Sequence, residues 1–157
     1  MQVTHLSLRP FSPKGQGNEP EKLRTYVLDS YALFALLQRE EGHEIVTDLM
    51  ACAENQEVLL YLSLINWGEM CYILERDHGE KVAMELIADM DSLPIVIGEV
   101  DRRRVLSAAH IKARYPVSYA DAFAIALADE LGAPVVTGDP EFKKVESMVT
   151  VLWLREV

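Results

Sequence analysis

Short apolar runs alternate with longer amphipathic segments along most of this chain. The runs at 25–28, 58–62, 94–97, 134–137 and 148–152 have the length of buried strands. Between them, apolar residues recur at helical spacing over 31–38, 43–54, 64–76, 80–90, 101–114 and 119–131. Strands that alternate with helices predict a single three-layer α/β domain, with a central, mainly parallel sheet of about five strands flanked by helices.

Composition sets the limits of this domain. The chain has 157 residues, half of them hydrophobic, which suits one folded core over residues 25–157. Residues 1–24 are rich in proline and glycine and lack apolar periodicity, so they predict a mobile tail. No apolar run is long enough to cross a bilayer or to form a signal-peptide core, which favours a cytoplasmic protein without membrane contact. Cys52 and Cys71 are interpreted as reduced packing residues.

One helical segment carries an unusual acid. From Ala120 to Ala128 the only polar side chain is Asp121. A helix that is apolar on nearly all sides is normally buried, and a carboxylate in such a place is costly without a compensating group. Ser118 precedes this segment, so a helix-capping role is the plainer alternative for Asp121.

Three further acids follow strands or begin helices. Asp29 directly follows the first predicted strand, Glu69 lies about two turns into the helix after the second, and Asp139 lies just beyond the fourth. Each has an ordinary alternative, as a helix cap or a solvated helix residue. Ligands of open α/β sheets bind beyond the carboxyl ends of the strands, where all four acids are expected. Gathered there, they would need protons or a cation to relieve their repulsion.

The order of these motifs resembles the PIN domain family, and most closely its VapC-type ribonuclease toxins. The resemblance covers essentially all of 25–157. It rests on Tyr26-Val27-Leu28-Asp29-Ser30, Asn66-Trp67-Gly68-Glu69, Tyr119-Ala120-Asp121-Ala122-Phe123-Ala124-Ile125-Ala126 and Val135-Val136-Thr137-Gly138-Asp139-Pro140-Glu141-Phe142.

The resemblance implies a metal-dependent endoribonuclease, the toxin of a type II toxin–antitoxin pair. It implies one or two Mg²⁺ or Mn²⁺ ions held by Asp29, Glu69, Asp121 and Asp139, with Glu69 holding or deprotonating the attacking water. Ser30, Thr137 and Glu141 are candidates to support these acids. A cognate antitoxin protein and a homodimer are the expected partners. A PIN-like scaffold without catalysis, or a receiver-type signalling domain, remains an alternative from the sequence.

The negative net charge of the chain opposes RNA binding. The formal net charge is −10, which repels nucleic acid at long range and requires a local positive patch. Arg103 and Arg114 fall on one face of the predicted 101–114 helix, together with Ser107 and His110. Lys143 and Lys144 follow the last acid. These basic residues are candidate RNA contacts. An ordinary solvated surface is the alternative for the helix face.

Overall fold

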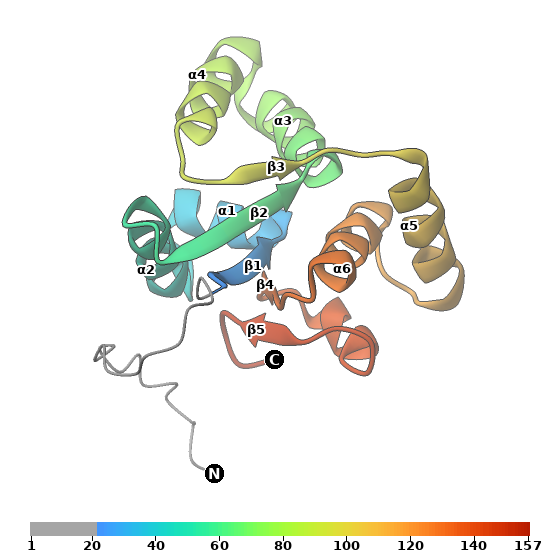
Figure 1. The fold of residues 1–157 in the computed structure, drawn as a ribbon. Helices are drawn as coiled ribbons and strands as arrows, with labels where there is room; N and C mark the ends of the chain where they lie inside the picture. The colour runs from blue at the N-terminus through green and yellow to red at the C-terminus, as the bar shows by residue number, and fades with distance from the viewer. Residues whose placement is uncertain (1–21) are drawn as a thin grey trace, which may run out of the picture.

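The computed structural model describes residues 22–157, so most of the predicted tail lies outside the described residues. The chain runs β1 (Arg24–Leu28), α1 (Ser30–Gln38), α2 (His43–Glu54), β2 (Val58–Ser63), α3 (Leu64–His78), α4 (Glu80–Asp91), β3 (Val96–Gly98), α5 (Arg102–Arg114), α6 (Tyr119–Leu131), β4 (Val135–Thr137), the 3₁₀ helix η1 (Pro140–Val145) and β5 (Val151–Trp153). Figure 1 shows this succession. The structure thus confirms the predicted alternation of strands and helices.

The five strands form one sheet in the order β3-β2-β1-β4-β5, and every neighbouring pair is parallel. From β1 the chain first builds the sheet through β2 to β3, and later adds β4 and β5 on the other side. The order of the strands therefore reverses between β1 and β4, which creates a topological switch point. The carboxyl ends of all five strands share one edge, and the loops that follow them meet there.

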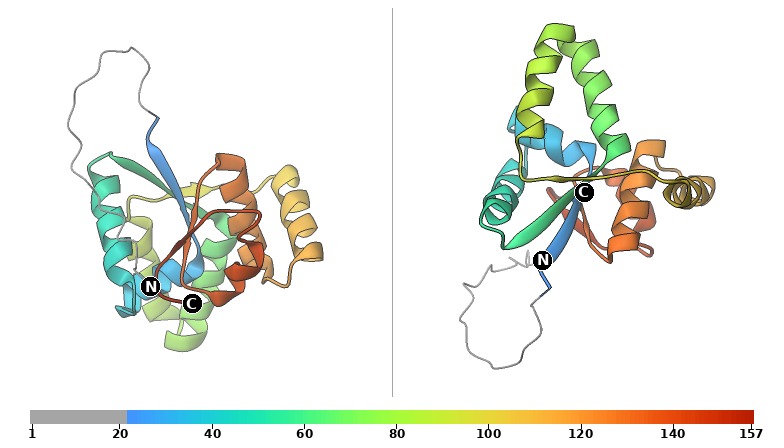
Figure 2. Two further views of the ribbon diagram at one scale, coloured as in Figure 1. Left: turned by 90° about the horizontal axis from the view of Figure 1, so that it is seen from below. Right: turned by 45° about the horizontal axis from the view of Figure 1, so that its top comes forward.

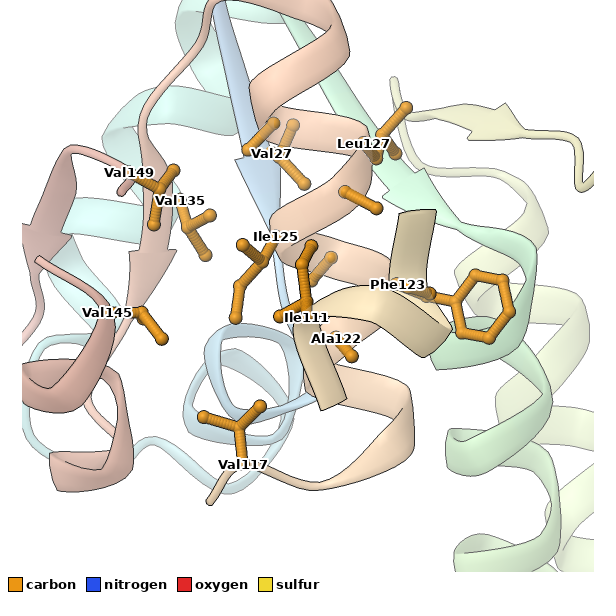
Figure 3. Packing of buried hydrophobic residues seen from close by; sticks show 14 of the residues in the cluster. Val27, Ile111, Val117, Ala122, Phe123, Ile125, Leu127, Val135, Val145 and Val149 are labelled. Carbon is orange, nitrogen blue, oxygen red and sulfur yellow. The ribbon is translucent and has the colours of Figure 1, made fainter. Parts of the chain in front are cut away.

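Alternate residues of the central strands face two separate apolar clusters. Val27 and Val135 pack with α5, α6 and the segment around η1, whereas Leu28 and Val136 pack with α1 to α4. Figure 3 shows the first cluster, with Ile125 of α6 and Ile111 of α5 among the buried side chains. The sheet is thus the middle layer of a three-layer domain, as the sequence predicts.

Helix α6 is buried on nearly all sides. Residues 121–128 are buried without a break, because the helix packs on the sheet and α5 covers its outer side. Figure 1 shows α5 outside α6. This double cover explains the apolar sequence from Ala120 to Ala128 and confirms the prediction of a buried helix.

The strand boundaries differ most from prediction where strands are short. β3 occupies 96–98 rather than 94–97, and β5 occupies 151–153 rather than 148–152. Met148 and Val149 donate backbone hydrogen bonds to the carbonyl of Val145, so they form a turn although they are apolar. Apolar content alone does not separate such a packed turn from a strand. Leu59 of β2 is 37% exposed, so this strand is not covered fully on both faces.

The hairpin of α3 and α4 projects away from the sheet (Figure 2). Ile87 and Met90 of α4 pack inward against the core rather than offering a free apolar face. Cys52 and Cys71 are partly buried free thiols, and burial raises the pKa of each. No helix within residues 22–157 has the length and apolarity needed to traverse a membrane.

Candidate active site at the carboxyl edge of the sheet

Asp29 links the central strand to the first helix. It follows β1 and is the N-cap of α1, where one carboxylate oxygen accepts a 2.9 Å hydrogen bond from the amide of Ala32. The residue is only 1% exposed. The pKa of Asp29 is raised from 3.8 to about 8, mainly by burial and in part by the charges of Asp121 and Asp139, although hydrogen bonds from Thr137 and the Ala32 amide act to lower it. The capping role predicted as an alternative is therefore real, but the buried carboxyl group is ionised only at an energetic cost.

Asp121 lies in the first turn of α6 and is 8% exposed. It forms a capping box with Ser118: its Oδ2 accepts from the Ser118 amide at 3.2 Å, and the Ser118 hydroxyl accepts from the Asp121 amide at 3.0 Å. Burial raises the pKa of Asp121, and the charges of Asp139 and Glu69 add to this effect. Its other carboxylate oxygen accepts no hydrogen bond from residues 22–157.

Asp139 follows β4 and caps η1. Its Oδ1 accepts a 2.8 Å hydrogen bond from the Glu141 amide, and its own amide donates to the hydroxyl of the buried Thr137 at 3.0 Å. Thr137 thus holds the Asp139 loop and also lowers the pKa of Asp29. The structure therefore gives Thr137 a supporting position between two acids. Glu141 offers its backbone amide to Asp139.

Glu69 is held by the neighbouring helix. The Ser30 hydroxyl donates to Oε2 of Glu69 at 2.6 Å, and Nδ2 of Asn66 donates to the Ser30 oxygen at 3.2 Å. Asn66 is fully buried, and its Oδ1 is the one buried side-chain oxygen or nitrogen in the described part of the chain without a hydrogen-bond partner. A chain of contacts from α3 through α1 therefore fixes the Glu69 carboxylate.

The four acids lie close enough for their charges to affect one another's pKa. The pKa of Asp29 and that of Asp121 are both raised mainly by burial, and in part by the other acids. Across 22–157, none of the four forms an ion pair with a lysine, arginine or histidine. The site thus holds buried carboxyl groups that influence one another and have no ion-paired basic residue in the described part of the chain.

The chemistry of this site suits a hard cation. Its donors are carboxylate oxygens and the hydroxyls of Ser30 and Thr137, the type of ligand that Mg²⁺ prefers. Within the described range, no group of three or more His, Cys, Asp or Glu side chains is gathered closely enough to hold a metal ion directly. Because Mg²⁺ keeps several of its waters, carboxylates that do not bind a bare ion together can still bind a hydrated one through those waters.

The basic residues named from the sequence lie in different places. Arg103 pairs with Glu130 at 2.7 Å, near the C-terminal end of α6 and about 13 Å along that helix from Asp121. Arg114 contacts His110 at the other end of α5. Lys143 contacts the carbonyl of Val157. Lys144 is exposed on η1. Arg103 therefore lies away from Asp121, whereas Arg114 ends the helix that leads into α6.

Sequence reasoning missed two supporting features. Asn66 stands in the motif around Glu69, but nothing in its spacing shows that it would bond to Ser30. The second feature joins three segments: Arg155 donates from Nε to the carbonyl of Gly138 at 2.9 Å and lies over the ring of Tyr31. Such long-range contacts depend on the sheet order, which local patterns do not encode.

Comparison with known proteins identifies the class. The model of the PIN domain matches residues 26–147, so the chain belongs to the PIN domain family. This confirms the resemblance drawn from the four acidic motifs. Among curated proteins, no relative matches the chain.

Solved structures share this fold at low sequence identity. A DNA-bound VapBC from Salmonella typhimurium superposes with a TM-score of 0.66 at 18% identity, covering 85% of this chain and 100% of that one. VapBC-1 from nontypeable Haemophilus influenzae gives 0.64 at 16% identity, covering 84% and 99%. VapC20 from Mycobacterium tuberculosis, a sarcin-ricin loop cleaving toxin, gives 0.61 at 20% identity, covering 75% and 92%. These likenesses establish the PIN fold.

Proposed function

We propose that this protein is a divalent-metal-dependent endoribonuclease and the toxin of a type II toxin–antitoxin pair. The observation that carries the proposal is the burial of Asp29 and Asp121 beside Glu69 and Asp139, without a basic partner among residues 22–157. Membership of the PIN domain family supports a nuclease, and the VapBC and VapC20 neighbours support a toxin.

Each acid has a distinct task in this proposal. Asp29, Asp121 and Asp139 would hold one or two Mg²⁺ or Mn²⁺ ions, because their capping bonds fix the carboxylates at one edge. Glu69, oriented by Ser30, would position the attacking water and accept its proton. When bound, the cation supplies positive charge that lowers the pKa of a water and neutralises charge developing on the scissile phosphate.

A cluster of acidic residues also suits regulation by a basic partner. A cognate antitoxin that inserts a cationic side chain would compete with the metal for the same carboxylates. A toxin–antitoxin complex from Klebsiella pneumoniae is among the solved structures that share this fold, which supports such a partner for the present chain. We also propose that the protein forms a homodimer. Ile87 and Met90 would not lie in the dimer interface, because both pack inward.

Cleavage of total RNA tests the function. The wild-type protein should fragment RNA when Mg²⁺ or Mn²⁺ is present and should lose this activity in EDTA. Asp121→Asn should be inactive, whereas Asp129→Asn, an exposed acid near the other end of α6, should cleave normally. Equal activity of Asp121→Asn and wild type, or metal-independent cleavage, would contradict the proposal. Metal binding without any cleavage would favour the inert scaffold.

A further inference from the structure

Arg155 is a fixed cation at the carboxyl edge of the sheet. It lies two residues beyond β5, which pairs in parallel with β4, and Asp139 lies two residues beyond β4. The two strand ends are therefore neighbours on the same edge. This placement brings an arginine from the last segment of the chain to the loops that carry the acids.

Two contacts fix the guanidinium group. Its Nε donates to the carbonyl of Gly138, the residue before Asp139, at 2.9 Å. Its central carbon lies 5.2 Å from the centre of the Tyr31 ring, two residues after the Asp29 cap, in cation–π range. Gly138 itself packs tightly on Tyr31, since a Cβ there would lie 2.4 Å from Cε1 of the ring. Arg155 is thus braced between the segments that hold Asp139 and Asp29.

These contacts leave most of the guanidinium available. The contact with Gly138 uses Nε alone, and the two Nη groups have no hydrogen-bond or ion-pair partner within 22–157. Several other basic side chains are already engaged: Arg103 and Arg104 with Glu130, Arg76 with Asp77, Lys112 with the carbonyl of Val117, and Lys143 with that of Val157. Arg155 is partly exposed, so a ligand can reach it.

We infer that Arg155 binds a backbone phosphate of the RNA strand next to the acidic site. A planar guanidinium with free Nη groups matches the geometry of a phosphate and remains charged at all working pH values. The acidic edge and the net charge of −10 oppose an RNA strand, so a cation held at this edge would set where the strand enters. This inference rests on the proposed function, and it names Arg155 as a substrate-positioning residue.

Salt-dependent RNA binding tests it. A labelled single-stranded RNA is titrated with the Asp121→Asn protein in Mg²⁺, alone and combined with Arg155→Gln, Arg155→Lys or Arg76→Gln. Arg155→Gln should weaken binding about tenfold. It should also reduce the slope of log K against log salt by about 0.7, the value for one contact to a single strand. Arg155→Lys should keep the slope but bind more weakly, because a lysine lacks the braced planar fork.

Arg76→Gln is the matched control, because it removes the same charge from an exposed residue that pairs only with Asp77. Its binding and slope should equal those of the parent. An unchanged slope for Arg155→Gln would overturn the inference. So would a loss of RNA affinity that is explained by a matching fall in the melting temperature of the variant. If the parent protein binds no RNA, the proposed function and the inference are both wrong; if it binds and Arg155→Gln matches it, only the assignment of Arg155 is wrong.

Discussion

The hydroxyl of Ser30 donates a 2.6 Å hydrogen bond to the carboxylate of Glu69, which lies 39 positions further along the chain. Ser30 is the first residue of α1, and Glu69 lies in the second turn of α3. The bond therefore joins the helix that begins at Asp29 to the helix that follows β2. It fixes the acid that we propose as the base for the attacking water.

Removing this hydroxyl should slow cleavage without unfolding the protein. Ser30→Ala leaves Glu69 without its charge-assisted hydrogen bond, and we expect kcat to fall about tenfold, as for a loss of roughly 1.4 kcal/mol. KM for RNA should change little. Ser30→Thr keeps a hydroxyl and should retain most of the activity. Steady-state cleavage of a defined RNA at saturating Mg²⁺ measures both constants, and a wild-type kcat for Ser30→Ala would contradict the role of this bond.

Asp29 has a structural task and a proposed catalytic task, and two substitutions separate them. Asp29→Asn can still accept the hydrogen bond from the Ala32 amide, so it should keep the fold but abolish metal-dependent cleavage. Asp29→Ala should also be inactive, and it loses the cap, at a cost of about 1 kcal/mol. Thermal unfolding in EDTA should then show Asp29→Ala about 2–4 °C below Asp29→Asn. Full activity of Asp29→Asn would refute its assignment as a metal ligand.

The raised pKa of Asp29 predicts how stability depends on pH. The folded chain holds this proton up to about pH 8, whereas the unfolded chain releases it near 3.8. The folded state therefore binds more protons between these values, so the free energy of unfolding of the metal-free protein falls as the pH rises from about 4 to about 8. For one group the fall is at most about 1.4 kcal/mol per pH unit. Asp121, whose pKa is also raised, adds to it.

Urea unfolding in EDTA across this pH range measures the effect. Asp29→Asn should weaken the pH dependence, because the residue no longer titrates. Addition of Mn²⁺ at pH 8 should restore stability to the wild type, since the ion replaces the lost proton as the compensating charge. Identical pH dependence of stability in the wild type and in Asp29→Asn would show that burial does not raise the pKa of Asp29.

Gly138 is predicted to be intolerant of any side chain. An added Cβ would lie 2.4 Å from the Tyr31 ring, so Gly138→Ala should cost about 1–3 kcal/mol and displace the Asp139 loop. Gly68→Ala is the control: apart from its own stretch of helix, no atom lies within 4 Å of its added Cβ, and alanine in a helix should stabilise by about 0.5–1 kcal/mol. In a Tyr31→Ala background the cost of Gly138→Ala should shrink; an unchanged cost, measured by chemical unfolding, would place the clash elsewhere.

Local patterns were sufficient for most of the fold. The short continuous apolar runs, the helical spacing and the caps at Asp29 and Ser118 predicted the succession of elements, and the uninterrupted apolar run of α6 predicted its burial. The boundaries of β3 and β5 were wrong because these strands are only three residues long, and the apolar turn at Met148 and Val149 resembles a strand in sequence.

The site was predictable only in part, because some of its contacts join residues that are far apart in the sequence. The positions of the acids after strand ends indicated one shared edge, because parallel strands end together. The contacts of Asn66 with Ser30 and of Arg155 with Gly138 span 36 and 17 positions and follow from the order of the strands and the packing of α1 against α3. No local periodicity reports such pairs.

We propose that Asp29, Glu69, Asp121 and Asp139 together hold a divalent cation. Calorimetric titration of the purified protein with MnCl₂ near pH 8 tests it most directly, with Asp121→Asn and Asp129→Asn titrated alongside. We predict saturable binding to the wild type and to Asp129→Asn, and at least tenfold weaker binding to Asp121→Asn. Binding of equal strength in all three proteins, or none to the wild type, would contradict the account.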